Sequence, residues 1–406
     1  MAPVTAQGAE AERRRRQIEE LSAIERASAS AGEERSAEWI AAELRGLGAS
    51  PRIETEAAVG SYWLPFGLLS LLSLAGGVAT WRGRRTLGVL SAGIAGAALI
   101  DDLALGLRGF RRLIAKRRTS NVLACFGPQD SERTLIFIAH HDAARSGFIF
   151  NPSGGEAIAR RAPWLLERLK TAPPIFWPVI AGPAGIAVGG LLRRNRLTAL
   201  GAGLSLISLA AFLDVGRHRA VPGAIDNASG VIALLTLGRR LVEKPPKTIR
   251  VVLLFTGGEE ALWEGIDGFA RRHFKALPTD RTAFINVDQV GDQFLNLLSA
   301  EGPVKLRPYS PELIALLEQV AEEAGIELRF PNLRGRSGGD SQRPLKAGYP
   351  TAYLQSLTEH KLETAYHWPT DTPDKVNYAT LASAVDLCEA AVRRVDERWI
   401  GSESGQ

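Results

Sequence analysis

Residues 134–147 read TLIFIAHHDAARSG, and this stretch decides the fold class of the chain. A run of apolar and β-branched residues leads directly into His140, His141 and Asp142. Such a continuous apolar run is typical of a strand that is buried on both faces of a parallel sheet. Two imidazoles and a carboxylate at the end of a buried strand are costly unless other side chains pair with them. A site at this strand end therefore requires partner side chains from elsewhere in the sequence.

Other segments have the same strand pattern and alternate with amphipathic helices. Further strands are expected at 52–56, 120–126, 249–256, 282–288 and 351–355. Helices are expected at 9–47, 228–243, 260–273, 311–324 and 379–396. Alternating strands and helices of this kind predict an α/β fold with parallel strands.

Two uncharged regions interrupt this pattern. Residues 61–81 and 86–100 flank the turn RGRR at 82–85, and residues 171–192 and 197–213 flank RRNR at 193–196. A membrane-spanning helix needs about 20 apolar residues, which the first arm of each pair provides. The second arms are long enough only if they run past the aspartates that follow them or if the bilayer thins. We expect two inserted apolar helical hairpins in a membrane; buried core helices or a cap on the membrane surface are the alternatives.

These changes in composition divide the chain. Residues 1–60 are expected to hold an N-terminal helix and the first strand of the globular domain. The hairpins are expected at 61–107 and 171–215, and the rest of the domain at 108–170 and 216–399. A disordered tail is expected at 400–406. The formal net charge is +5 and the isoelectric point is about 9.3. Because no nucleic-acid-binding motif accompanies this mild positive charge, nucleic acid is not an expected partner.

Four further segments place acidic or imidazole side chains in turns or at strand ends. They are PGAIDNASG (222–230), LLFTGGEEALWEG (253–265), INVDQVGD (285–292) and AYHWPTDTPDKV (365–376). Taken singly, Asp226 reads as a helix N-cap, Glu259 and Glu260 as partners of a helix dipole, and His367 as an exposed loop residue. Together they favour a shared site, because open α/β sheets bind ligands at the carboxyl ends of their strands.

The candidate metal ligands are two imidazoles and three carboxylates. They are His140, Asp226, Glu260, Asp288 and His367, a set that suits two divalent cations, zinc first. Strand alternation puts His140 and Asp142 on one face and points His141 away. Asp142 would then orient an imidazole as part of the catalytic group, and Glu259 remains free to act as a general base.

The ordered motifs AHHD, GAIDNASG, TGGEE, NVDQVG and YHWPTDTPD resemble those of the co-catalytic zinc aminopeptidases of metallopeptidase family twenty-eight. The resemblance covers roughly residues 18–56, 108–150 and 221–396. It implies a mixed β-sheet between helical layers and peptide substrates with a free N-terminus. It also implies two Zn²⁺ ions, for which Mn²⁺ or Co²⁺ could substitute. By the same resemblance His140 and Asp288 would bind one ion, Glu260 and His367 the other, and Asp226 both, with Glu259 as the base.

The chain departs from the family pattern at its two hairpins. The second lies between Asp142 and Asp226, and the first is expected to interrupt the pairing of the N-terminal strands. In the segment 337–356, which resembles the part of the family that lines the substrate side, Asp340 is expected to be a structural cap. Two alternatives remain open: a glutaminyl-cyclase-like acyltransferase with a single zinc, and a receptor-like domain without activity. The complete ligand set favours the peptidase.

The expected mechanism follows from the pair of cations. Two ions about 3.5–4 Å apart would hold a bridging water and lower its pKa. Glu259 would take the proton of this water and pass it to the leaving amine.

The active site also constrains the topology in the bilayer, the other expected partner. Because His140 and Asp226 must meet, the second hairpin has to return to the side from which it leaves. More Lys and Arg flank the hairpins on the domain side than in the turns, RRRR stands at 13–16, and no signal peptide is evident. These features favour a multi-pass protein with a cytoplasmic catalytic domain, whereas the arginine-rich turns favour the reverse.

Overall fold

The computed structural model describes residues 6–172 and 176–400, so residues 401–406 of the expected disordered tail lie outside it. Within these residues the centre is a seven-stranded sheet in the order β1-β2-β4-β3-β5-β10-β6. The strands are β1 (Arg52–Ala58), β2 (Arg117–Phe126), β3 (Thr134–His140), β4 (Arg250–Thr256), β5 (Thr282–Val287), β6 (Phe294–Leu297) and β10 (Thr351–Leu357). Strands β4, β3, β5 and β10 are parallel, and the others join antiparallel. The prediction of a mixed α/β sheet between helices is confirmed.

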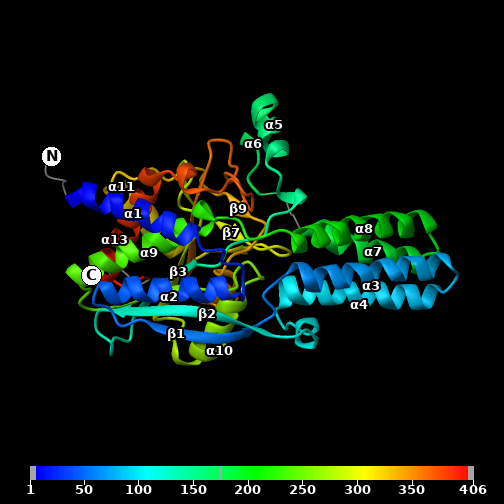
Figure 1. Cartoon of the computed structure of the whole chain (residues 1–406), viewed down its shortest axis with the longest axis horizontal. Helices are drawn as coiled ribbons and strands as arrows, with labels where there is room; N and C mark the ends of the chain where they lie inside the picture. Colours follow the sequence, from blue (N-terminus) through cyan, green and yellow to red (C-terminus); the bar gives the residue numbers. More distant parts are fainter. Residues whose placement is uncertain (1–5, 173–175, 401–406) are drawn as a thin grey trace.

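Helices cover both faces of the sheet (Figure 1). One face packs against α1 (Ala6–Ser22), α2 (Ala31–Gly46), α9 (Ser229–Glu243), α11 (Pro311–Glu323) and α13 (Tyr378–Glu397). The other packs against α10 (Glu264–His273) and the near ends of the hairpin helices. A small sheet of β7 (Ala300–Glu301), β8 (Arg307–Pro308) and β9 (Arg334–Gly335), with the short helix α12 (Gln342–Lys346), completes the domain.

The alternation of β3 decides where the end of this strand points. Leu135 and Phe137 are buried in the core beneath α9, whereas Ile136 and Ile138 are buried in the core beside the hairpins. Because side chains alternate along a strand, His140 continues the second row and His141 the first. The imidazole of His140 therefore faces the side of the sheet on which the hairpins stand.

The single helix expected over 9–47 is wrong. The structure has two helices, α1 and α2, with a break between Ser22 and Ala31. Ser30 ends the break, because its side chain accepts hydrogen bonds from the backbone N–H groups of Gly32 and Glu33 and so caps α2. An N-cap serine inside a polar, helix-favouring stretch was the signal that the prediction overlooked.

The two hairpins form a four-helix bundle that extends away from the sheet (Figure 1). Its helices are α3 (Trp63–Trp81), α4 (Arg85–Ile100), α7 (Trp177–Leu191) and α8 (Asn195–Arg217). Three helical segments are long and apolar enough to cross a membrane: Trp63–Trp81, Arg85–Ala104 and Asn195–Arg217. The expectation that the first arm of each pair is long enough to span is wrong for the second hairpin. Among the described residues its first arm, α7, has only 15 residues, whereas its second arm, α8, has 23.

Both insertions leave and re-enter the domain at adjacent points. Strands β1 and β2 pair across the first hairpin, from Arg52 opposite Leu123 to Ala58 opposite Arg117. Arg145 forms a bridge with Ala220 across the second insertion. The expectation that the first hairpin interrupts the strand pairing is wrong, because the hairpin takes the place of the turn between two paired strands.

The bundle depends on close approach between α7 and α8. A Cβ atom on Gly201 would lie 2.6 Å from the carbonyl oxygen of Gly182, whereas one on Gly203 would meet nothing within 4 Å. Small residues allow helix backbones to approach closely in apolar surroundings. We expect Gly201→Leu to destabilise the purified protein by about 1–3 kcal/mol through overpacking, measured as a lower thermal midpoint in detergent. Gly203→Leu on the same helix is the matched control, and equal midpoints for the two variants would contradict this packing.

Candidate metal centre

The five sequence-predicted ligands come together at the carboxyl edge of the sheet. His140 ends β3, Asp288 directly follows β5, and Glu260 lies in the turn that follows β4, so three neighbouring parallel strands deliver one side chain each. Asp226 precedes α9, and His367 comes from the loop after β10. This is the edge at which doubly covered parallel sheets place their ligands.

The distances within the cluster define two groups that share Asp226. His140 Nε2 lies 3.2 Å from Asp226 Oδ1 and 3.4 Å from Asp288 Oδ1. His367 Nε2 lies 3.4 Å from Asp226 Oδ2 and 3.2 Å from Glu260 Oε2. Asp226 therefore turns one oxygen to each group, as a carboxylate that bridges two cations would do. In each group the ligand atoms lie within 4.8 Å of one another.

The donor atoms fit a pair of divalent cations. Within the described chain, Asp226 Oδ2, Glu260 Oε1 and Asp288 Oδ1 are buried without a hydrogen-bond partner. Unpaired buried carboxylate oxygens cost free energy unless a cation compensates them. Imidazole nitrogen and carboxylate oxygen are donors that zinc accepts.

The pKa values of the cluster depend on burial and on the neighbouring charges. Although burial alone would lower it, the carboxylates of Asp288, Asp142 and Asp226 raise the pKa of His140 well above its ordinary value. Burial and the charge of Asp226 raise the pKa of Glu260. Cations at this place would let the imidazoles act as neutral ligands and the carboxylates as anions.

Asp142 links the strand to the turn that carries Glu259 and Glu260. Its carboxylate accepts the backbone N–H groups of Glu259 and Glu260, each at 3.1 Å, and the hydroxyl of Ser28 at 2.5 Å. Its Oδ1 also lies 3.5 Å from Nδ1 of His140. Asp142 thus holds both the imidazole and the acidic turn in place, and touches neither cavity beside the cluster.

Glu259 differs from the other acids of the cluster. Its carboxylate forms no hydrogen bond or ion pair with any residue that the structure describes, and it borders both cavities beside the ligands. One of its oxygens also lies within 4.8 Å of ligand atoms of His140 and Glu260. Burial raises the pKa of Glu259, and the nearby carboxylates of Glu260 and Asp340 raise it further against the opposing charge of His140. An unpaired carboxylate beside a metal cluster is available for proton transfer.

Sequence reasoning missed two residues behind the cluster. Asp371 accepts the backbone N–H groups of Ile225 at 2.7 Å and Asp226 at 3.1 Å, and so fixes the bridging residue. Arg26, which is fully buried, donates to the carbonyl oxygens of Pro222 and Gly223. Asp371 stands in the quoted YHWPTDTPD motif and could have been singled out, whereas nothing in the sequence around Arg26 distinguishes it.

Three other polar residues lie outside the group of five ligands. His141 is buried on the opposite face, where Ser36 Oγ lies 2.6 Å from its Nδ1. Asp340 is buried and accepts the hydroxyl of Thr256. His360 is partly buried and lines a cavity beside the ligands.

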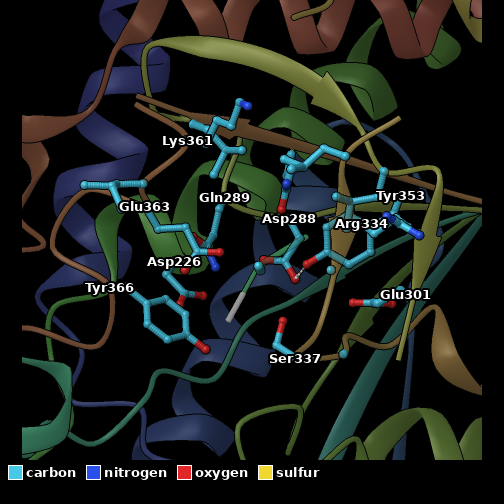
Figure 2. A pocket seen from close by; sticks show the side chains of 18 of the residues that line it. Asp226, Asp288, Gln289, Glu301, Arg334, Ser337, Tyr353, Lys361, Glu363 and Tyr366 are labelled. Atoms are coloured by element: carbon cyan, nitrogen blue, oxygen red, sulfur yellow. Dashed lines mark hydrogen bonds between the residues drawn. The ribbon is translucent and has the colours of Figure 1, made fainter. Parts of the chain in front are cut away.

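Two cavities meet at the cluster. The smaller cavity, of about 140 Å³, is lined in part by polar side chains such as Glu301 and Arg334. Figure 2 shows Glu363 and Tyr366 beside Asp226, with Glu301 and Arg334 on the far side of Asp288. The larger, of about 700 Å³, extends from Glu259, Glu260 and His367 to the near ends of α3, α7 and α8.

A comparison of the sequence with known families finds one match. Residues 206–392, a little under half of the chain, match the model of Peptidase family M28. This part contains Asp226, Glu259, Glu260, Asp288 and His367, whereas His140 lies upstream of it. No protein of curated function matches the sequence significantly.

Solved structures share the fold over nearly the whole chain. A zinc aminopeptidase from Bacillus subtilis superposes with a TM-score of 0.55 at 14% identity, covering 95% of each chain. A Zn-dependent exopeptidase from Parabacteroides distasonis gives 0.54 at 13% identity, covering 96% of this chain and 98% of its own. A glutaminyl cyclase from Bacteroides thetaiotaomicron, bound to N-acetylhistamine, gives 0.57 at 13% identity, covering 94% and 97%. At these identities the likeness establishes the fold.

Proposed function

We propose that this chain is a membrane-anchored zinc metallopeptidase that removes N-terminal amino acids from peptides. The match to Peptidase family M28 and the exopeptidase fold support a zinc-dependent peptide hydrolase. The observation that carries the finer assignment is the shared Asp226, whose two oxygens face two separate imidazole–carboxylate groups. Such an arrangement suits two ions held on either side of one carboxylate.

The chain's own residues would then divide the work. Divalent cations at these ligands would polarise the scissile carbonyl and activate water near neutral pH. His140 and Asp288 would hold one ion, Glu260 and His367 the other, and Asp226 both. Glu259 would accept a proton from the attacking water and deliver it to the amine as the C–N bond breaks. Asp142 would keep Glu259 and His140 in register.

The direct test is hydrolysis of a panel of aminoacyl reporters by the purified full chain, with and without a chelator. We expect release of the reporter from the zinc-loaded protein, loss after chelation, and recovery when Zn²⁺ is restored. Mn²⁺ or Co²⁺ should also restore activity, since both accept imidazole and carboxylate ligands. Zinc-loaded protein that cleaves no reporter would contradict the proposal.

A glutaminyl cyclase is the second candidate, because such enzymes are among the structural neighbours at a similar TM-score. The two functions differ in the expected metal content, since the cyclase-like alternative would use a single zinc. Elemental analysis of the purified protein separates them: close to two zinc ions per chain supports the peptidase, and one ion with cyclisation of N-terminal glutamine supports the cyclase.

The surface of the bundle supports an anchor in the lipid bilayer. Large apolar side chains lie more than half exposed along its outside, among them Leu90, Ile94 and Leu200. A contiguous apolar surface of this kind is typical of contact with lipid or another apolar partner.

An arm at the base of the bundle supports the same placement. The arm comprises residues 148–170, with α5 (Ser153–Arg161) and α6 (Pro163–Glu167), and projects from the molecule in a different direction from the bundle (Figure 1). It exposes Ile158, Trp164 and Leu165 beside Arg160 and Arg161. Tryptophan and basic side chains next to apolar ones suit the level of the lipid headgroups. The arm would lie on the membrane surface while the bundle enters the bilayer.

The catalytic domain is proposed to lie in the cytoplasm, with both arginine turns on the far side. In intact cells a cysteine placed at Arg82, in the first turn, should then react with a membrane-impermeant thiol reagent. A cysteine at the exposed domain residue Glu318 should not react until the membrane is opened. The opposite labelling pattern would place the active site outside.

A further inference from the structure

We infer that the substrate is an apolar peptide whose residues behind the scissile bond occupy the 700 Å³ cavity between the ligands and the bundle, called here the apolar cavity. This inference rests on the proposed peptidase function and adds the class of peptide that the site accepts. The position, walls, mouth and charge of the cavity carry it.

The apolar cavity begins at the reacting groups. Glu259, Glu260 and His367 border it, so a bound chain would pass directly beside the proposed base and one ion. A volume of about 700 Å³ is that of a pocket for a ligand larger than one side chain. The smaller cavity, of about 140 Å³, is close in size to one that holds a single ring. The smaller cavity would therefore hold one N-terminal residue, and the apolar cavity the several residues that follow it.

The walls of the apolar cavity come from the bundle. Tyr62 at the start of α3, Phe176 and Val179 at the start of α7, and Ala211 and Phe212 near the end of α8 line it. Burying an apolar side chain against such walls is favourable, whereas a polar side chain would lose its hydrogen bonds to water. The cavity therefore discriminates in favour of apolar residues.

The mouth of the apolar cavity combines exposed apolar side chains with the polar residues Asn151 and Glu156. Ile149 of the arm and Ile207 of α8 both line it and are 47% and 62% exposed. Both lie where the arm meets the bundle, which is the proposed level of the lipid headgroups. Ile149 and Ile207 would offer apolar contacts to a peptide that enters the cavity from the bilayer.

One acidic residue decides between a peptide and a fatty acyl amide as the occupant. Glu363 borders both cavities. Within the described part of the chain (residues 6–172 and 176–400), its carboxylate forms no hydrogen bond or ion pair. Figure 2 shows it beside Asp226. An unpaired carboxylate at the junction is complementary to the free α-amino group of a peptide. An acyl amide carries no cation there, so the peptide fits the charge.

The test compares two peptide series that begin with the same residue and continue with either apolar or uncharged polar residues. We expect the zinc-loaded full chain, in one detergent, to give a kcat/KM about tenfold or more higher for the apolar series. Ala211→Trp narrows the cavity and should lower kcat/KM for the apolar series toward the value for the polar series. Ala210→Trp, on the exposed side of the same helix, should keep the preference.

A second variant tests the amine. Glu363→Gln should raise KM for free-amine peptides by about tenfold, the loss expected for a charge-assisted hydrogen bond, with little change in kcat. Equal rates for the two peptide series, or an unchanged preference in Ala211→Trp, would overturn the inference while the peptidase proposal stands. Faster cleavage of fatty-acyl amino acids than of free-amine peptides would also overturn it. Failure to cleave any aminoacyl reporter would instead contradict the proposed function itself.

Discussion

Glu259→Gln is expected to lower kcat by about 10²–10⁴-fold, the contribution of a positioned general base. The amide keeps the shape of the side chain but cannot accept the proton of the attacking water. KM and the zinc content should change little, because Glu259 belongs to neither group that shares Asp226. The measurement is steady-state hydrolysis of an aminoacyl reporter, with elemental analysis of the same preparation.

A matched variant guards against a general effect of losing one negative charge. Glu318→Gln changes an exposed acid on α11, far in sequence from every ligand, and should behave as the unmodified protein. Near-normal release of amino acids by Glu259→Gln would remove Glu259 from its proposed role.

Asp226→Ala is expected to have the largest effect on metal binding. Its two oxygens face both groups, so the substitution removes a ligand from each proposed site. Even outer-shell substitutions cost about 10–100-fold in metal affinity, and the loss of a shared ligand should exceed this. We expect zinc content well below one ion per chain after dialysis, and no measurable hydrolysis.

Two further variants serve as comparisons for the zinc content of Asp226→Ala. His367→Ala should lose one ion and retain the other, because His367 belongs to one group alone. Asp374→Ala, an exposed acid in the same motif, should retain both. Full zinc occupancy in Asp226→Ala would show that the carboxylate does not bridge two ions.

The apolar runs predicted the central sheet well, for a physical reason. Strands such as β3 and β5 are buried on both faces, so nearly every position is apolar and the run ends where burial ends. Because His140 and Asp288 follow directly after such runs, their place at the sheet edge could be read from the sequence. The small sheet could not, since two-residue strands such as β7 and β9 leave no periodic signal.

Features that depend on long-range packing remained hidden from the sequence. Arg26 contacts Pro222 and Gly223, nearly two hundred positions away, and nothing local in either segment marks the contact. The apolar cavity likewise exists only because Tyr62, Phe212 and the loop that precedes His367 converge in space. The composition of the hairpins predicted apolar helices but not that their near ends would border the ligands.

The pairing of β1 with β2 across the first hairpin has a consequence for biogenesis. A ribosome completes β1, then the first hairpin, then β2 and β3, then the second hairpin, and only afterwards the segment that carries Asp226. For a chain whose hairpins enter the bilayer during synthesis, the sheet cannot close before the first has been inserted, and the ligands cannot gather before the second. In such a chain His140 and Asp226 would come together only after both hairpins have entered the bilayer.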